Sequence, residues 1–162
     1  MNARTAADIM DRSEPSLTPD LDIGTAMHRM LSARLNGVPV VDADGRLCGM
    51  LTEKDCLRAL VRQAVDGASA ASVRDYMTTP VDSVTPETQL LDIAYLFLTH
   101  SYRKVPVIDA DGRLAGQVSR RDILRAIDSA KDNPFLYGGA QPPTRPETGG
   151  VHSAMQRALG KS

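Results

Sequence analysis

Two short motifs place a glycine, a hydroxyl residue and an aspartate at identical spacing. They are Gly49-x-x-Thr52-x-x-Asp55 and Gly116-x-x-Ser119-x-x-Asp122. A hydroxyl followed three residues later by an acid is typical of a capping box, in which both side chains bond the first turn of a helix. The same groups could instead bind a ribose phosphate, because amides at a helix N-terminus attract phosphate and a carboxylate accepts from hydroxyls. The motif alone leaves both interpretations open.

The two motifs belong to an internal repeat with an offset of 67 residues. Between Val38–Leu60 and Val105–Ile127, 14 of 23 positions are identical. Such similarity indicates a duplicated unit of roughly 60 residues. We expect a first unit over residues 1–67, including a lead-in, and a second over residues 68–132. Residues 133–162 are rich in glycine and proline, and we expect them to form a disordered tail.

Each unit has the same expected order of elements. Threonine–proline pairs predict helix starts at Thr18 and Thr85, followed by apolar residues at helical spacing. Two strands joined by an Asp-Gly turn come next, then a last helix, and a short strand precedes each unit. The expected strands are 16–17, 38–41 and 47–51, then 83–84, 105–108 and 114–118, and the last helices are about 53–65 and 120–130. One unit buries too little core to fold alone, so we predict an α/β fold of two β-α-β-β-α units packed by their sheets.

The paired units resemble tandem CBS domains, the family named after cystathionine beta-synthase. The resemblance covers about residues 5–130 and rests on motifs that occur twice in the same order: Asp8-Ile-Met10 and Asp75-Tyr-Met77, Thr18-Pro19 and Thr85-Pro86, Val38-Pro-Val-Val-Asp42 and Val105-Pro-Val-Ile-Asp109, and the two hydroxyl–aspartate motifs. It implies two pseudo-symmetric units, with clefts between them that bind AMP, ADP, ATP or S-adenosylmethionine. In this family the aspartate holds the ribose, and the threonine or serine approaches the phosphate.

The resemblance therefore implies that one hydroxyl and one acid of each unit bind the ligand: Thr52, Asp55, Ser119 and Asp122. The second unit is also more basic around its motif than the first, at Arg103, Lys104, Arg120 and Arg121. Basic groups beside a helix N-terminus favour a phosphorylated ligand, so we expect phosphate to bind at the second unit. The alternative for each basic residue is a solvated surface charge.

Catalysis has little support in the sequence, and we expect no enzyme activity, no required cofactor and no metal site. The three histidines do not recur at matched positions, and Cys48 and Cys56 align with alanine and isoleucine, as core residues would. A net charge of −1 and the absence of tryptophan disfavour nucleic-acid binding. We see no apolar stretch long enough for a bilayer and no signal peptide, so we expect no membrane contact and a cytoplasmic protein.

The leading functional hypothesis is a regulatory module that senses an adenosine-containing small molecule and acts on a separate, unidentified protein. The alternative is an assembly platform that dimerises and binds no nucleotide. The hydroxyl and the acid are present in both copies of the motif. Their retention favours the sensing module.

The helix expected over residues 90–100 predicts a homodimer. It is apolar at three positions where the first unit has glycine, histidine and arginine: Leu91, Tyr95 and Leu96. A helix that is apolar nearly all round has to be covered on more than one side, so we expect this helix and the last helices to pack across a two-fold axis. Light scattering at tens of micromolar protein should give the dimer mass with and without nucleotide. A monomeric mass would contradict the prediction.

Overall fold

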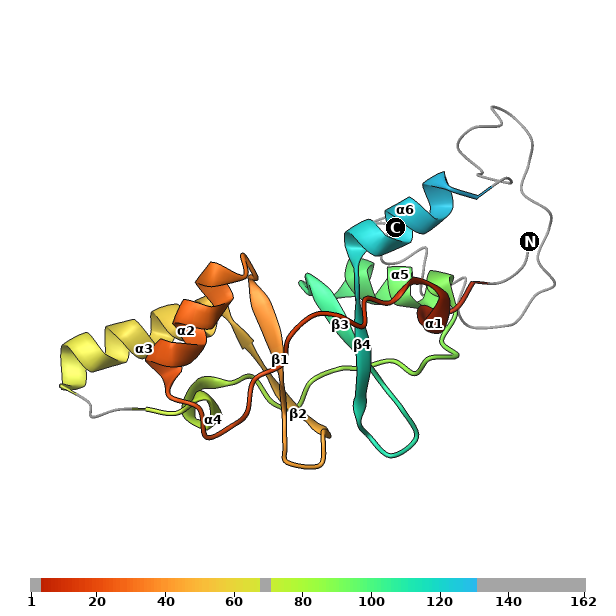
Figure 1. The fold of residues 1–162 in the computed structure, drawn as a ribbon. Helices are drawn as coiled ribbons and strands as arrows, with labels where there is room; N and C mark the ends of the chain where they lie inside the picture. The colour runs from red at the N-terminus through yellow and green to blue at the C-terminus, as the bar shows by residue number, and fades with distance from the viewer. Residues whose placement is uncertain (1–3, 68–70, 131–162) are drawn as a thin grey trace.

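The computed structural model describes residues 4–67 and 71–130. It is an α/β protein of two similar units that lie side by side, each with one β-hairpin and two main helices (Figure 1). The first unit contains α2 (Ile23–Ser32), β1 (Gly37–Val41), β2 (Leu47–Thr52) and α3 (Glu53–Asp66). The second contains α5 (Leu90–Thr99), β3 (Lys104–Ile108), β4 (Leu114–Ser119) and α6 (Arg120–Asp128). The predicted tail, residues 133–162, lies outside the described residues.

Each hairpin turns at an aspartate–glycine pair, as the sequence predicts. β1 pairs antiparallel with β2, and β3 pairs antiparallel with β4. Gly45 and Gly112 both have φ of 80°, a conformation that side chains with a Cβ rarely adopt. One parallel bridge precedes each hairpin in the chain, joining Leu17 to Val40 and Val84 to Val107. The β-α-β-β-α order is confirmed, although the first strand of each unit is a single bridge.

The first helix of each unit begins later than the threonine–proline pairs predict. α2 begins at Ile23, and its N-cap is Asp22, whose carboxylate accepts from the amide of Thr25 at 2.9 Å. Residues 18–21 form a turn instead, because their carbonyls accept from another segment: the amides of residues 73 and 74 donate to Leu21 and Pro19. α5 likewise begins at Leu90, and the amides of residues 6 and 7 donate to carbonyls of residues 88 and 86. The predicted helix starts at Thr18 and Thr85 were therefore wrong.

The segment before each unit, its lead-in (about residues 4–16 and 71–83), packs against the other unit, so the two lead-ins are exchanged. Each contains a single-turn helix, α1 (Ala6–Ile9) before the first unit and α4 (Val73–Tyr76) before the second. Ala6 is buried in the core of the second unit, whereas Val73 and Tyr76 are buried in the core of the first. Figure 1 shows α1 beside α5 and α6, and α4 beside α2 and α3. The boundary expected near residue 67 divides the sequence repeat, but each folded core includes the lead-in helix of the other copy.

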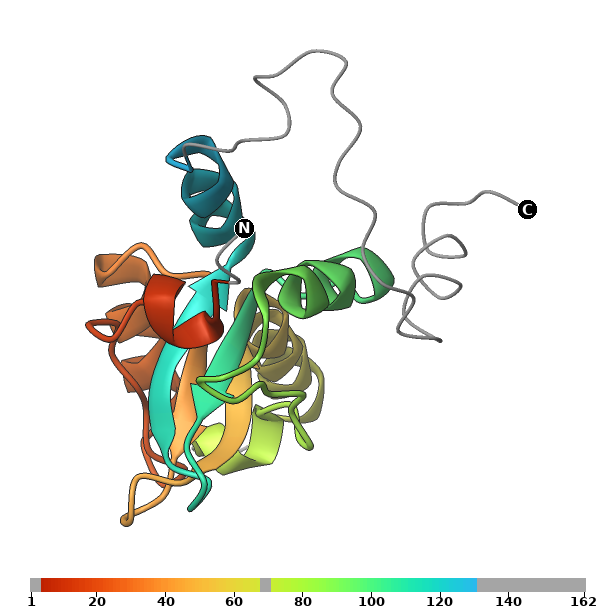
Figure 2. The same ribbon diagram turned by 90° about the vertical axis from the view of Figure 1, so that its right-hand side faces the viewer.

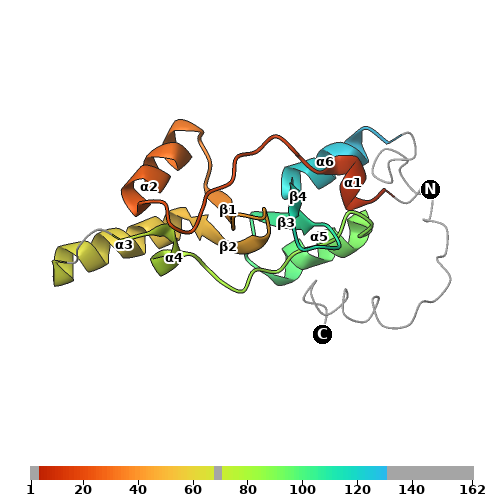
Figure 3. The ribbon, with the colours of Figure 1, turned by 60° about the horizontal axis from the view of Figure 1, so that its bottom comes forward.

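The two hairpins meet at their turns and join the units. Leu47 donates its amide to the Gly112 carbonyl, and Leu114 donates to the Gly45 carbonyl, both at 3.0 Å. Both hairpins turn on the same side of the molecule (Figures 1 and 2), and the main helices of the two units lie at opposite ends (Figure 3). The predicted packing of two units by their sheets is confirmed.

Gly116 lies where β4 passes close to the exchanged lead-in. A Cβ at this position would lie 2.8 Å from the carbonyl oxygen of Asp11, which is itself bonded to the Gln117 amide. Gly116→Ala should therefore lower the free energy of unfolding by about 1–3 kcal/mol, as overpacking does. Gly37→Ala is the matched control, because a Cβ there meets nothing closer than 3.7 Å. Urea unfolding measures both variants, and equal stabilities would show that the close approach is not a constraint.

Candidate functional site

Both hydroxyl–aspartate motifs form the capping boxes that their spacing predicts. Thr52 caps α3: its amide and hydroxyl donate to Asp55 Oδ2 at 2.9 Å, and the Asp55 amide donates back to Thr52 Oγ1 at 3.3 Å. Ser119 and Asp122 repeat this arrangement at the start of α6, at 2.8 and 3.2 Å. The capping interpretation is confirmed in both units. The cap uses only Oδ2 of each aspartate, so a ligand-binding role would depend on Oδ1.

The Oδ1 atoms of the two aspartates have different surroundings. Asp55 Oδ1 accepts from Arg58 at 3.2 Å and from the hydroxyl of Thr78 at 3.4 Å, and Asp55 is only 1% exposed. Asp122 is partly exposed, and its Oδ1 has no hydrogen-bond partner within the part of the chain that the structure describes. Protein groups therefore engage both oxygens of the Asp55 carboxylate, whereas one oxygen of the Asp122 carboxylate has no partner among the described residues.

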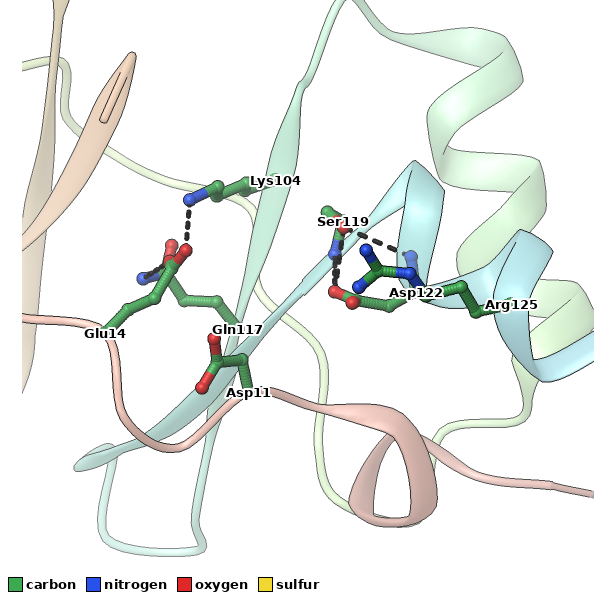
Figure 4. Close-up of a pocket in the computed structure, with 7 residues that line it drawn as sticks. All are labelled: Asp11, Glu14, Lys104, Gln117, Ser119, Asp122 and Arg125. Atoms are coloured by element: carbon green, nitrogen blue, oxygen red, sulfur yellow. Dashed lines mark hydrogen bonds and ion pairs between the residues drawn. The ribbon is translucent and has the colours of Figure 1, made fainter. Parts of the chain in front are cut away.

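A cavity of about 170 Å³ lies beside Asp122, where the first lead-in crosses β3, β4 and the start of α6 (Figure 4). Its lining residues are Asp11, Glu14, Lys104, Gln117, Ser119, Asp122 and Arg125. The lead-in supplies Asp11 and Glu14, and the second unit supplies the others. The cavity therefore exists because the lead-in is exchanged.

One wall of the cavity is a bonded set of three side chains. Lys104 Nζ lies 2.5 Å from Glu14 Oε1, and both side chains are largely buried. Gln117 Nε2 donates to the other oxygen, Glu14 Oε2, at 2.9 Å. Gln117 is only 3% exposed, and its Oε1 is buried without a hydrogen-bond partner among the described residues. These contacts use both oxygens of Glu14 and leave one buried acceptor of Gln117 unbonded.

Asp11 adds a third carboxylate to the cavity, after Asp122 and Glu14. Its Oδ1 accepts from the hydroxyl of Ser13 at 2.7 Å and from the amide of Ser13 at 2.8 Å. These bonds stabilise the charged form and hold the pKa of Asp11 below its usual range. The cavity lining therefore carries three acidic side chains and two basic ones, Lys104 and Arg125.

The structure brings three of the eight predicted ligand-binding residues together at this cavity: Lys104, Ser119 and Asp122. Thr52 and Asp55 form the matching arrangement at the start of α3 in the first unit. The ligand-binding roles of these five residues remain predictions.

The three predicted arginines lie elsewhere on the second unit. Arg103, Arg120 and Arg121 are exposed and do not line this cavity. Arg120 donates to the backbone carbonyl of Tyr102 at 2.8 Å, a contact that stabilises the chain before β3. Because none of the three arginines lines the cavity, its geometry does not support their predicted role in binding phosphate there.

Sequence reasoning missed Asp11, Glu14, Gln117 and Arg125 as cavity residues. Asp11 and Glu14 are far from the second unit in sequence, and only the exchange of the lead-in brings them there. The repeat contained a signal for Gln117, because the matching strand position in the first unit is Met50. A polar amide at a position that pairs inside a hairpin indicates a different environment in the two copies.

The cysteines behave as packing residues in the described structure. Cys48 and Cys56 pack against the core of the first unit, and burial raises the pKa of both thiols. A thiol with a raised pKa stays protonated and is a poor nucleophile. Among residues 4–67 and 71–130, no group of three or more His, Cys, Asp or Glu side chains could hold a metal ion. In the same ranges, no helix has the length and apolar character needed to cross a membrane.

A family profile described as CBS domain matches residues 6–62 and 73–129. The chain belongs to the CBS domain family. The CBS pair is similar to the crystal structure of CBSX2 from Arabidopsis thaliana in complex with AMP, with 29% identity and a TM-score of 0.66 over 76% of this chain and 95% of that one. It is also similar to the CBS domain pair of protein MJ0100 in complex with 5′-methylthioadenosine and S-adenosyl-L-methionine, with 25% identity and a TM-score of 0.64 over 78% and 97%.

The CBS pair also matches part of an enzyme. It is 32% identical over 120 residues to inosine-5′-monophosphate dehydrogenase from Halalkalibacterium halodurans, which is 72% of this chain but 24% of the enzyme. The chain spans 64% and 42% of the length of two other curated relatives. The similarity to the dehydrogenase therefore concerns about a quarter of that enzyme.

The different surroundings of the two aspartates predict different stabilities without ligand. Asp55→Ala removes the cap of α3 together with the Arg58 ion pair and the Thr78 hydrogen bond of a buried carboxylate, so it should cost about 2–3 kcal/mol of unfolding free energy. Asp122→Ala removes only a cap and should cost about 1 kcal/mol. Asp128→Ala, at the exposed end of α6, is the control and should change little. Unfolding in urea without nucleotide tests the order, and equal losses in the first two variants would contradict it.

Proposed function

We propose that this CBS pair is a regulatory module that binds an adenosine-containing ligand, such as AMP, ADP, ATP or S-adenosylmethionine. The observation that carries the proposal is the free Oδ1 of Asp122, held at the edge of a cavity by the Ser119 cap. A carboxylate oxygen accepts hydrogen bonds, and a ribose presents two neighbouring hydroxyl donors. The start of α6 adds backbone amides that suit a polar group on the same ligand.

Two similar proteins support the choice of ligand class. CBSX2 was crystallised with AMP, and the MJ0100 pair with 5′-methylthioadenosine and S-adenosyl-L-methionine. These three compounds share an adenosine group and differ in what is attached at its 5′ position. A ribose-binding aspartate would contact the part that they share.

The position of the cavity supports a regulatory role. Its lining joins Asp11 and Glu14 of the first lead-in to Asp122 of the second unit, and the same lead-in continues into the first unit. A ligand that bonds both walls would therefore bias how the units sit against each other. We propose that this change is passed to a separate protein target, that the chain does no catalysis and needs no cofactor, and that it works in the cytoplasm.

Exposed leucines favour the predicted homodimer. Leu31 and Leu57 of the first unit are 67% and 62% exposed, and their repeat partners Leu98 and Leu124 are 52% and 63% exposed. All four lie on the main helices, at positions related by the repeat. Apolar side chains exposed at matched places on both units fit a self-complementary interface. The same observation supports the second candidate function, an assembly platform without nucleotide.

A ligand panel separates the two candidate functions. Adenosine, AMP, ADP, ATP and S-adenosylmethionine are added singly, and the melting temperature is measured. A ligand at 100 times its dissociation constant stabilises the native state by about 2.7 kcal/mol, or roughly 5–10 °C for this size. We expect a shift of that order with at least one compound.

The variants assign that shift to the cavity. Asp122→Ala should lose most of it, Asp55→Ala should lose less because its carboxylate is already engaged, and Asp128→Ala should match the wild type. Equal shifts in all four proteins would contradict the assignment to Asp122. The absence of any shift with the wild type would overturn ligand sensing and favour the assembly platform.

A further inference from the structure

The cavity beside Asp122 differs chemically from the matching place in the first unit. At four positions, the residue that lines this cavity is charged or carries an amide group, whereas its repeat partner does neither. Asp11, Glu14, Lys104 and Gln117 correspond to Thr78, Val81, Gly37 and Met50. The backbone bridge between Asp11 and Gln117 is matched by one between Thr78 and Met50. The difference therefore lies in side-chain chemistry, which is where ligand choice is made.

Lys104 stands where it could meet an anionic group of a ligand. It is the first residue of β3, and its Cα partner on β4 is Ser119, the N-cap of α6. A phosphate at the start of α6 would lie close to this ammonium group. The largely buried carboxylate of Glu14, 2.5 Å away, already neutralises it. A phosphate could use Lys104 only by displacing Glu14, or by bringing more negative charge beside it.

The groups left unbonded in the cavity are mainly acceptors. Gln117 Oε1 is buried without a partner among the described residues, and Asp122 Oδ1 is likewise free. Gln117 Oε1 is fully buried, so the acceptor that a ligand donor can reach is Asp122 Oδ1, on a partly exposed side chain. Ribose hydroxyls and an adenine amino group are donors, whereas an ionised phosphate is acceptor-only.

The charges around the cavity also disfavour a ligand phosphate. Glu14 neutralises Lys104, which leaves the carboxylates of Asp11 and Asp122 against one cation, Arg125. Arg125 is exposed, and water screens its attraction for an anion. The inner part of the cavity therefore opposes negative charge, even though the second unit is the more basic one by sequence.

We propose that Glu14 is a specificity-determining residue, which makes this cavity select adenosine compounds with an uncharged 5′ group over those with a 5′ phosphate chain. The proposal rests on the proposed function, since it presumes that the cavity binds adenosine. Glu14 acts by neutralising the ammonium group of Lys104, and Gln117 holds Glu14 in that position. This selection reverses the expectation from sequence that basic residues make the second unit the phosphate site.

The test is calorimetric titration of the full chain with adenosine, 5′-methylthioadenosine, AMP and ATP. Binding that is lost in Asp122→Ala is assigned to this cavity. The wild type should bind the two uncharged compounds at least about tenfold more tightly than ATP, as a close buried charge pair allows. Glu14→Gln keeps the shape and an acceptor for Gln117 but removes the charge. It should tighten ATP binding about tenfold and leave the affinity for adenosine nearly unchanged.

Two further variants show whether Glu14 acts through Lys104. The tightening for ATP should disappear in the double variant Glu14→Gln/Lys104→Met, because the freed ammonium group is gone. Glu87→Gln is the matched control: it removes the same charge from an exposed position, and it should leave the ratio of the two affinities unchanged. Unfolding in urea confirms that each variant is folded before titration.

The outcomes distinguish the inference from the function on which it rests. If the wild type binds ATP as tightly as adenosine, or if Glu14→Gln changes both affinities equally, the role of Glu14 is overturned while adenosine binding stands. If tightening persists without Lys104, the route through Lys104 is wrong and so is the inference. If no compound binds, the proposed function falls and the inference falls with it.

Discussion

Backbone pairing between each lead-in segment and the hairpin of the other copy is the constraint on which the rest of the structure depends. Asp11 and Gln117 exchange amide-to-carbonyl bonds at 2.8 and 3.0 Å, and Thr78 and Met50 do the same at the same two distances. The pairing brings the lead-in backbone close to β2 and β4: a Cβ at Gly49 would lie 3.1 Å from the Thr78 carbonyl oxygen, and one at Gly116 would lie 2.8 Å from that of Asp11. Because of this exchange, each core is completed by a helix of the other copy.

The same pairing creates the candidate site. It carries Asp11 and Glu14 to the end of β4, where the Ser119 cap holds Asp122. In the first unit, the equivalent lead-in brings the Thr78 hydroxyl to Asp55 instead. One backbone geometry is therefore used twice with different side chains. In the first unit the aspartate is bonded within the protein, and in the second it keeps a free oxygen beside a cavity.

This difference between the two units suggests how the CBS pair could carry out the proposed sensing. A ligand in the second-unit cavity would contact a lead-in that belongs, in sequence, to the other unit, so binding and the relation between the units are coupled by construction. The coupling needs no catalytic group, and the raised thiol pKa values of Cys48 and Cys56 fit a packing role. The exposed leucines on the main helices favour the proposed homodimer.

The sequence by itself determined the local structure, because local bonds depend on neighbouring residues. The repeat, the Asp-Gly turns and the two capping boxes required only short-range spacing, and the strands and last helices followed from them. The helix starts at Thr18 and Thr85 could not be predicted in this way, since amides of the exchanged lead-ins take the carbonyls beside them. Glu14 reaches Gln117 and Lys104 only through that exchange. Only the tertiary structure decided these contacts, because they join residues about a hundred positions apart, which spacing along the chain does not encode.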